Sequence, residues 1–178
     1  MIFNNTDNLK IYHKILCDSV KSGDYRNMLC FCYGQTGSGK TFTMLDQRGL
    51  VRLSALQMFW YCLAMTPAES GTTTANHPAY DLYMSSFEIY NEKIYDLMNK
   101  HKRLRMCEDS NKISKIVALS ERKITSEEDV SNYIDKCKRY RQTGISSKNN
   151  ASSRSHAIYF LSIKKSNESV VSNSPNRY

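Results

Sequence analysis

The stretch that decides the fold is Tyr33–Met44, with the sequence YGQTGSGKTFTM. Three of the chain's seven glycines lie within positions 34–39, directly before Lys40 and Thr41. A backbone with so few Cβ atoms lets consecutive N–H groups converge on a ligand that carries several negative charges. The stretch therefore predicts a phosphate-binding loop.

The residues on either side of this loop give it a structural context. Met28–Tyr33 is an unbroken apolar run, which predicts a strand buried on both faces of a parallel sheet. After the loop, an apolar stripe at helical spacing predicts a helix. The residues of this stripe are Leu50, Leu53, Leu56, Phe59, Trp60 and Leu63. Between strand and helix, Gly34–Thr41 matches the pattern G-x-x-x-x-G-K-[ST], which in this setting indicates a nucleotide-phosphate site.

Each residue of the loop has an expected task. Lys40 would place its ammonium between the β- and γ-phosphates, and the Thr41 hydroxyl would ligate a Mg²⁺ shared with the same oxygens. Phe42 follows the loop, where its ring could stack on a base or pack in the core, and the sequence leaves both open. The cofactor-binding candidates are Gly34, Gln35, Thr36, Gly37, Ser38, Gly39, Lys40, Thr41 and Phe42.

Length and composition limit the classes of protein. The chain has 178 residues, 40% hydrophobic and 24% charged, as expected for one globular domain. The longest apolar run, 58–65, is too short to span a membrane, and the first residues contain no signal-peptide core. The net charge of +8 favours an acidic partner. Nucleic acid is not the expected partner, because the aromatic residues follow core periodicities and are not interleaved with the cations.

The six cysteines include no CxxC pair, and the histidines are not clustered. We therefore expect neither a zinc site nor a disulfide framework, and we expect the thiols to be reduced. Cys30 and Cys32 alternate along the predicted strand Met28–Tyr33, so we expect them to pack in the core as small hydrophobic residues.

Apolar spacing predicts two further helices and three further strands. One helix should begin at Thr6 or Asp7 and end near Gly23. Another should begin after its cap Ser126, with acidic residues in its first turn and basic residues, Arg141 among them, in its last turns. Strands are expected around residues 83–89, 119–124 and 157–163, and a loose polar segment at 166–178. The residues expected to face inward from the second helix are Val130, Tyr133, Ile134 and Cys137.

A second polar segment, Asn149–His156 with the sequence NNASSRSH, directly precedes the predicted strand 157–163. Cleavage of a γ-phosphate needs a second element that closes on it and orients an attacking water. This segment is a candidate because it is dense in small hydroxyls, carries one fixed cation and would lie at the end of a strand. Taken alone, its composition favours an ordinary polar loop.

Together, these stretches resemble the motor domain of kinesins. A third block, Ser86–Leu97 with the sequence SFEIYNEKIYDL, is similar to a strand of that family, and Leu104–Asp109 is similar to the charged segment that follows it. The resemblance implies an α/β P-loop NTPase with a kinesin-motor-like central sheet flanked by helices, incomplete in this chain. It places part of a motor domain at 1–165 and a disordered tail at 166–178. A small kinase or GTPase would share the loop but would leave the other blocks unexplained.

The resemblance also implies residue roles. Ser153 would join Thr41 around Mg²⁺, Ser152 and Asn149 would lie near the γ-phosphate and its water, and Arg154 would pair with a glutamate of the second switch loop. The implied cofactors are ATP and Mg²⁺. The implied partner is the microtubule, through tubulin, and the implied location is the cytoplasmic cytoskeleton.

The chain departs from the family pattern in several places. It does not contain the D-L-A-G-S-E block of the second switch or the R-x-R-P stretch. It also lacks segments that resemble the main microtubule-binding helix and the neck, and a homodimer would need such segments. Val51 stands where the family usually has proline. We expect exposed sheet edges, weak nucleotide binding and little turnover, because one switch cannot be bistable alone. The alternative is a degenerate, non-catalytic motor half that binds tubulin or another partner.

Overall fold

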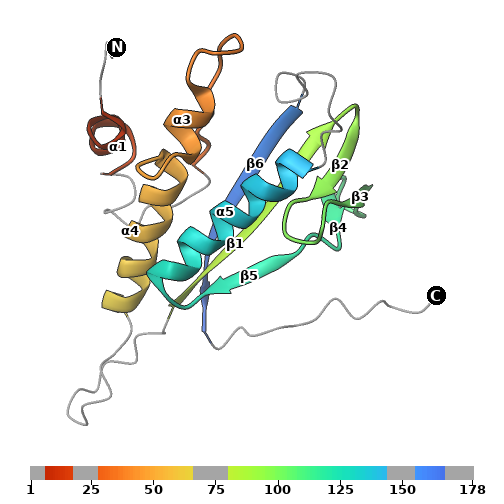
Figure 1. Cartoon of the computed structure of the whole chain (residues 1–178). Helices are drawn as coiled ribbons and strands as arrows, with labels where there is room; N and C mark the ends of the chain where they lie inside the picture. Colours follow the sequence, from red (N-terminus) through yellow and green to blue (C-terminus); the bar gives the residue numbers. More distant parts are fainter. Residues whose placement is uncertain (1–6, 18–27, 66–79, 144–154, 167–178) are drawn as a thin grey trace.

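The computed structural model describes residues 7–17, 28–65, 80–143 and 155–166. These residues form an antiparallel sheet with helices packed beside it (Figure 1). The helices are α1 (Asn8–Ile15), α3 (Lys40–Leu45), α4 (Leu50–Met65) and α5 (Glu127–Thr143). The strands are β1 (Tyr80–Tyr90), β2 (Lys93–Asp96), β3 (Lys102–Glu108), β4 (Ser114–Val117), β5 (Glu121–Ile124) and β6 (Ser155–Lys165).

Strand β1 is the centre of the sheet. It pairs with β6 along its whole length, from Tyr80↔Lys165 to Tyr90↔Ser155. Its other edge pairs with β5 near the start of the strand and with β2 near its end. Strand β2 continues to β3, and β3 to β4. All these pairings are antiparallel, so the described sheet is built from hairpins and one long return strand.

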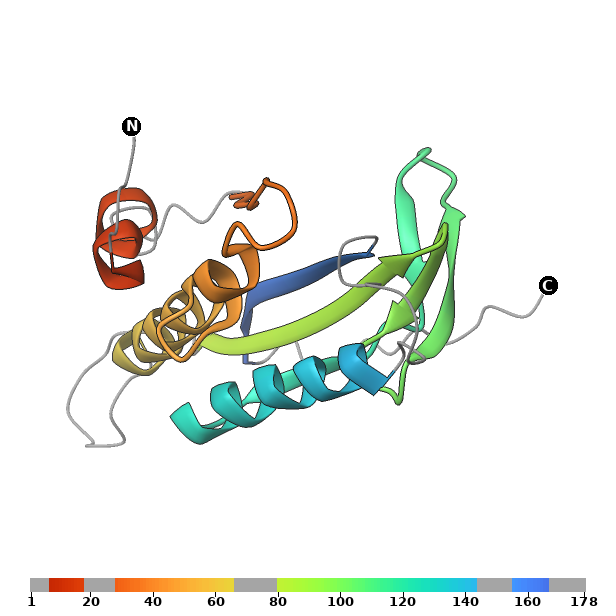
Figure 2. The ribbon, with the colours of Figure 1, turned by 45° about the horizontal axis from the view of Figure 1, so that its top comes forward.

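The face of β1 that carries Leu82 and Met84 packs against α4 and α5. Figure 2 shows α5 running along this side of the strand. In α5, Val130, Ile134 and Cys137 are completely buried, as the sequence predicts. The helix begins as predicted, because the Ser126 hydroxyl accepts a hydrogen bond from the Asp129 amide at 3.1 Å. One continuous core therefore joins the sheet to both helices.

The predicted helix after the loop is confirmed as α4, but its buried face differs from the prediction. Trp60 is 56% exposed and Leu63 is 48% exposed. Leu50 and Phe59 are buried as predicted, and the buried side of the helix also includes Val51, Ala55, Met58 and Cys62. The helix carries apolar residues on all of its sides, so their spacing cannot predict which side will face the sheet.

The predicted buried strand at Met28–Tyr33 is wrong for this structure. The segment has no strand pairing, and Leu29 and Phe31 are 84% and 77% exposed. A central parallel strand needs a hydrogen-bonding neighbour at each edge, and the described strands pair only among themselves. Cys30 is exposed and Cys32 is half-buried, so core packing of these thiols is also wrong.

The remaining predicted elements are present where the structure describes them, whereas β2, β3 and β4 were not among the strands expected from apolar spacing. Helix α1 begins after Asp7, whose side chain accepts from the Leu9 amide at 3.2 Å. The strands expected around 83–89, 119–124 and 157–163 are confirmed as β1, β5 and β6. Helix α1 ends at Ile15, with Leu16 as its C-cap, so the prediction that this helix extends to near Gly23 is wrong. Residues 18–27 and all but the first residue of the predicted tail 166–178 lie outside the described residues.

Candidate functional site

The glycine loop has a backbone that requires glycine at two positions. Gly37 and Gly39 adopt φ values of 87° and 86°, in the left-handed region where a side chain is strained. A Cβ added at either residue would meet no atom within 4 Å. Conformation, not crowding, therefore explains these two glycines.

Gly34 meets a different constraint. A Cβ at this position would lie 2.5 Å from the Ser38 Oγ atom, so the two sides of the loop approach each other closely. The Ser38 amide also donates to the Gln35 carbonyl at 3.2 Å. The loop is a tight turn that leads directly into α3.

Lys40 lies across this turn. Its Nζ atom donates to the Gly34 carbonyl at 2.7 Å and to the Gln35 carbonyl at 2.8 Å. A lysine ammonium has three donors, so these contacts leave one for another acceptor. Two loop carbonyls thus hold one positive charge against the backbone of the loop. This arrangement suits a phosphate, which needs both a cation and backbone donors.

The next two residues extend the site along α3. Thr41 is exposed, so its hydroxyl is accessible to a ligand. Phe42 is 60% exposed, which does not fit the core role that the sequence left open. Its backbone is held nonetheless, because the buried Asn8 side chain donates to the Phe42 carbonyl at 3.1 Å. The ring is therefore presented at the surface by a fixed backbone.

The predicted catalytic residues Asn149, Ser152, Ser153 and Arg154 lie outside the described residues. The last two residues of their segment, Ser155 and His156, begin β6. In Figure 1 the glycine loop and the start of β6 both lie toward the upper end of the molecule. The structure thus locates one end of the segment and leaves the predicted roles as predictions.

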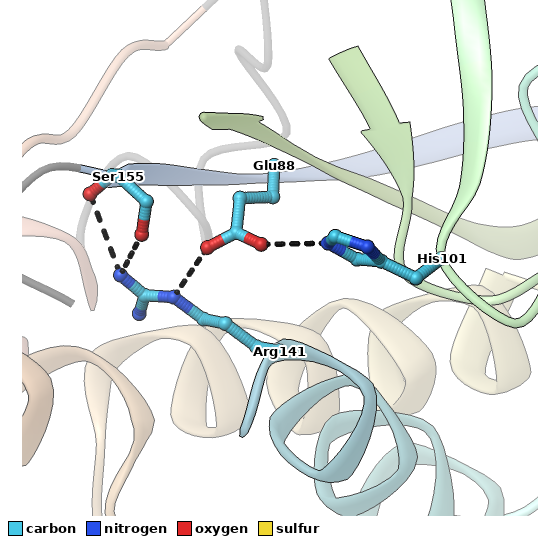
Figure 3. Close-up of polar contacts among 4 residues, drawn as sticks. All are labelled: Glu88, His101, Arg141 and Ser155. Carbon is cyan, nitrogen blue, oxygen red and sulfur yellow. Dashed lines mark hydrogen bonds and ion pairs between the residues drawn. The ribbon is translucent and has the colours of Figure 1, made fainter. Parts of the chain in front are cut away.

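A cluster of charged side chains surrounds the start of β6 (Figure 3). The Glu88 carboxylate is 3% exposed and accepts from Arg141 Nε at 3.1 Å. Its other oxygen lies 2.9 Å from His101 Nε2. Arg141 Nη2 also donates to Ser155, at 3.1 Å to the hydroxyl and 3.4 Å to the carbonyl. The cluster joins β1, α5, β6 and the turn between β2 and β3.

The sequence did not identify this cluster. The sequence predicted only a strand around residues 83–89, and in that strand Glu88 is 2% exposed whereas Ile89 is 37% exposed. Arg141 was interpreted only as a basic residue at the helix end. The available signal was a carboxylate placed between the apolar residues Phe87 and Ile89, because such a carboxylate needs a cation if it is buried.

Among the described residues, no group of three histidine, cysteine or acidic side chains could hold a metal ion. This does not conflict with a Mg²⁺ site of the predicted kind, which uses a threonine hydroxyl and phosphate oxygens. The described residues supply one such ligand, Thr41. The other predicted ligand, Ser153, lies outside them.

Comparison with known proteins agrees with the resemblance seen in the sequence. A family model described as "Kinesin motor domain" matches residues 2–177. The chain is 37% identical over 146 residues to the kinesin-like protein KIN-13B of Arabidopsis thaliana, covering 82% of this chain and 20% of that protein. It is 38% identical to KIN-13A of Oryza sativa subsp. japonica over 141 residues, which are 76% of this chain and 15% of that protein.

A human relative has a similar degree of identity. The kinesin-like protein KIF24 of Homo sapiens is 38% identical over 143 residues, which are 79% of this chain and 10% of that protein. The chain therefore spans between a tenth and a fifth of the length of these curated relatives. The match to the family model includes the glycine loop, the block Ser86–Leu97 and the segment Asn149–His156, on which the resemblance was based.

Proposed function

Because this chain belongs to the kinesin motor domain family, we propose that it is part of an ATP-driven microtubule motor whose nucleotide site is the loop Gly34–Thr41. The predicted α/β fold, with a central sheet flanked by helices, is the fold of this family. Its members are in general ATPases that bind ATP with Mg²⁺. The same proposal extends to this chain the activity of a complete motor, with the microtubule as its track and partner.

The observation that carries the proposal is the placement of Lys40 over the glycine loop. Its ammonium lies within 2.8 Å of two loop carbonyls, and Gly37 and Gly39 hold the left-handed backbone that such a loop requires. We propose that the amides of residues 34–39 bind the phosphates and that Lys40 contacts the β- and γ-phosphates. The bound nucleotide would supply the phosphoanhydride whose cleavage drives movement.

The residues that follow would complete the ligand shell. We assign the Thr41 hydroxyl, together with Ser153, to Mg²⁺. The exposed Phe42 ring would stack on the base, and its 60% exposure supports this role over a core role. Ser152 and Asn149 would lie near the γ-phosphate and its attacking water, and Arg154 would pair with a second-switch glutamate.

We expect residues 1–178 alone to bind nucleotide weakly and to hydrolyse little of it. The sequence contains no D-L-A-G-S-E block against which the first switch could act, and a phosphate-sensing device needs two elements that change together. We also expect poor solubility, because Leu29 and Phe31 in the apolar segment 28–33 are exposed. Microtubule-stimulated phosphate release by this polypeptide, measured with a malachite-green assay, would contradict the expected lack of turnover.

The proposed partner is the microtubule, and the proposed location is the microtubule cytoskeleton of the cytoplasm. The net charge of +8 suits the acidic surface of tubulin. We place the partial motor domain at residues 1–165, with the tail at 166–178. No described helix has the length and apolar character needed to cross a membrane.

Equilibrium binding of a fluorescent ATP analogue tests the nucleotide site. Lys40→Ala should weaken binding about tenfold or more, because one charge-assisted contact is worth about 1.5–3 kcal/mol. Lys93→Ala is the matched control, since it removes the same charge from an exposed position on β2. Equal affinities of the Lys40→Ala and Lys93→Ala variants would refute the site. Removal of Mg²⁺ with a chelator should weaken binding by the wild-type chain and should have a smaller effect on Thr41→Ala.

The alternative hypothesis of a non-catalytic binding module makes a different prediction. It requires tubulin binding that is independent of Lys40. No feature of the described residues favours it, and the ordered lysine and glycine geometry of the loop supports a retained nucleotide role. Microtubule co-sedimentation of the wild-type and Lys40→Ala chains, with and without nucleotide, separates the two hypotheses.

A further inference from the structure

The guanidinium of Arg141 connects two strands. Arg141 lies in the last turn of α5, and its side chain is only 17% exposed. Its Nε atom donates to Glu88 on β1, whereas Nη2 donates to the hydroxyl and carbonyl of Ser155 on β6. Figure 3 shows the fork of the guanidinium between these two groups. A basic residue that served only to complement the helix end would not need both contacts.

The position of the fork is determined by a buried charge. Glu88 needs compensation because a carboxylate with 3% exposure has lost nearly all of its hydration. One of its oxygens faces Arg141 and the other faces His101. If the Arg141 guanidinium moved away, the Glu88 carboxylate would stay buried and would lose one of its two partners. This cost holds the guanidinium beside Ser155.

The second partner of Glu88 is fixed as well. The His101 ring stacks on Tyr95, with ring centroids 4.4 Å apart and planes within 1° of parallel. His101 has φ 58° and its neighbour Lys100 has φ 50°. Such a backbone is unfavourable for residues other than glycine unless the surroundings hold it. The turn, the ring stack and the carboxylate thus form a rigid base for the Arg141 contact.

From this geometry we propose that Arg141 is a positioning residue of the nucleotide site. It anchors Ser155, and through it the start of β6, to the buried Glu88. The inference rests on the proposed function, in which the residues that directly precede Ser155 in the chain face the γ-phosphate. A fixed Ser155 gives those residues a constant point of attachment to the sheet. Arg141 itself contacts neither nucleotide nor Mg²⁺.

Two substitutions separate this role from general stabilisation. Arg141→Lys retains a cation for Glu88, but a single ammonium cannot reproduce the fork that contacts Glu88 and Ser155 together. Ser155→Ala leaves the Glu88–Arg141 pair intact and removes the acceptor at 3.1 Å. Ser162→Ala is the matched control, because it makes the same change on β6 at a half-buried position away from the cluster.

Hydrogen exchange of the nucleotide-free chain gives the first readout. Both Arg141→Lys and Ser155→Ala should accelerate exchange of the amides of residues 156–159 about tenfold, as expected for the loss of one charge-assisted hydrogen bond. Ser162→Ala should not. If both variants exchange these amides at the rate of Ser162→Ala, Arg141 does not anchor the strand and the inference is wrong. Ser155→Ala maintains the test if Arg141→Lys fails to fold.

Affinity for a fluorescent ATP analogue gives the second readout. Arg141→Lys and Ser155→Ala should bind about three- to tenfold more weakly than Ser162→Ala, which corresponds to the loss of one hydrogen bond. If the wild-type chain binds the analogue through Lys40 and the two variants bind as tightly as the control, the positioning role is overturned and the proposed function stands. If the wild-type chain shows no Lys40-dependent binding, the proposed function fails, and the positioning role fails with it.

Discussion

Substitution of Asp96 by asparagine should destabilise the fold strongly, although the two side chains have the same shape. Asp96 is completely buried. One of its oxygens accepts from the amides of Met98 and Asn99, at 2.7 and 3.1 Å, and the other accepts from the Ser120 amide at 2.8 Å. The carboxylate thus closes the turn after β2 and attaches the chain before β5 to it.

An asparagine can replace only one of these oxygens. In either orientation, its NH₂ group faces a backbone N–H, so at least one buried donor loses its acceptor. The lost charge-assisted bond is worth about 1.5–3 kcal/mol, and the unsatisfied donor costs about 1–3 kcal/mol more. We therefore expect Asp96→Asn to lower the free energy of unfolding by about 3–5 kcal/mol. For a chain of this length, that is a decrease of roughly 10 °C in Tm.

Urea and thermal unfolding followed by circular dichroism measure this change. Asp109→Asn is the matched control, because Asp109 also accepts two backbone amides, from Asn111 and Ile113 at 2.9 and 3.0 Å. Its side chain is 22% exposed, so water can replace a lost acceptor and the effect should be much smaller. The reasoning is refuted if Asp96→Asn unfolds within about 2 °C of the wild-type chain, or if both variants lose equal stability.

Three further predictions concern stability. Gly49→Ala should be destabilising, because the added Cβ would lie 2.5–2.7 Å from three backbone atoms that no rotamer change can move. Unfolding in urea measures the loss of stability, and a midpoint equal to that of the wild-type chain would contradict the prediction. Ile134→Ala should lower the free energy of unfolding by about 2–5 kcal/mol in the same assay. Trp60→Ala, at a 56% exposed position, should change it by less than about 1 kcal/mol. Equal losses for the two variants would show that the core is wrongly identified. Hydrogen bonds from the Thr125 hydroxyl and amide hold the pKa of Asp129 below its ordinary value of 3.8. This carboxylate therefore stabilises the fold fully above that value and less as the pH falls through its lower folded-state pKa, so Asp129→Asn should reduce the loss of stability between pH 7 and pH 3; an unchanged loss would argue against the assignment.

Local patterns predicted the features that depend on neighbouring residues in the chain. The cap Ser126 and the apolar positions of α5 follow from the energetics of one helix, and both are confirmed. The glycine loop is similar, because left-handed φ values at Gly37 and Gly39 are a property of the backbone at those residues. The motif blocks identified the family for the same reason, since each block is a continuous stretch of sequence.

Features that depend on partners distant in the chain were not predictable in this way. Met28–Tyr33 has the composition of a buried strand but lacks a pairing strand among the described residues. Strands β2, β3 and β4 were not expected from apolar spacing, and the burial of Glu88 was not expected either. Residues 84–88 of β1 are all buried because neighbours cover both faces of the strand there. Period-two alternation holds only where one face is open to solvent.

By itself, then, the sequence determined the family, the left-handed backbone of the glycine loop and the capped helix α5, because each depends on interactions between residues close together in the chain. Only the tertiary structure decided that Glu88 is buried and that Arg141 bridges it to Ser155. A charge separated from its partner by 53 residues acquires that partner only when the sheet and α5 pack together. The burial that makes the pairing obligatory arises from that same packing.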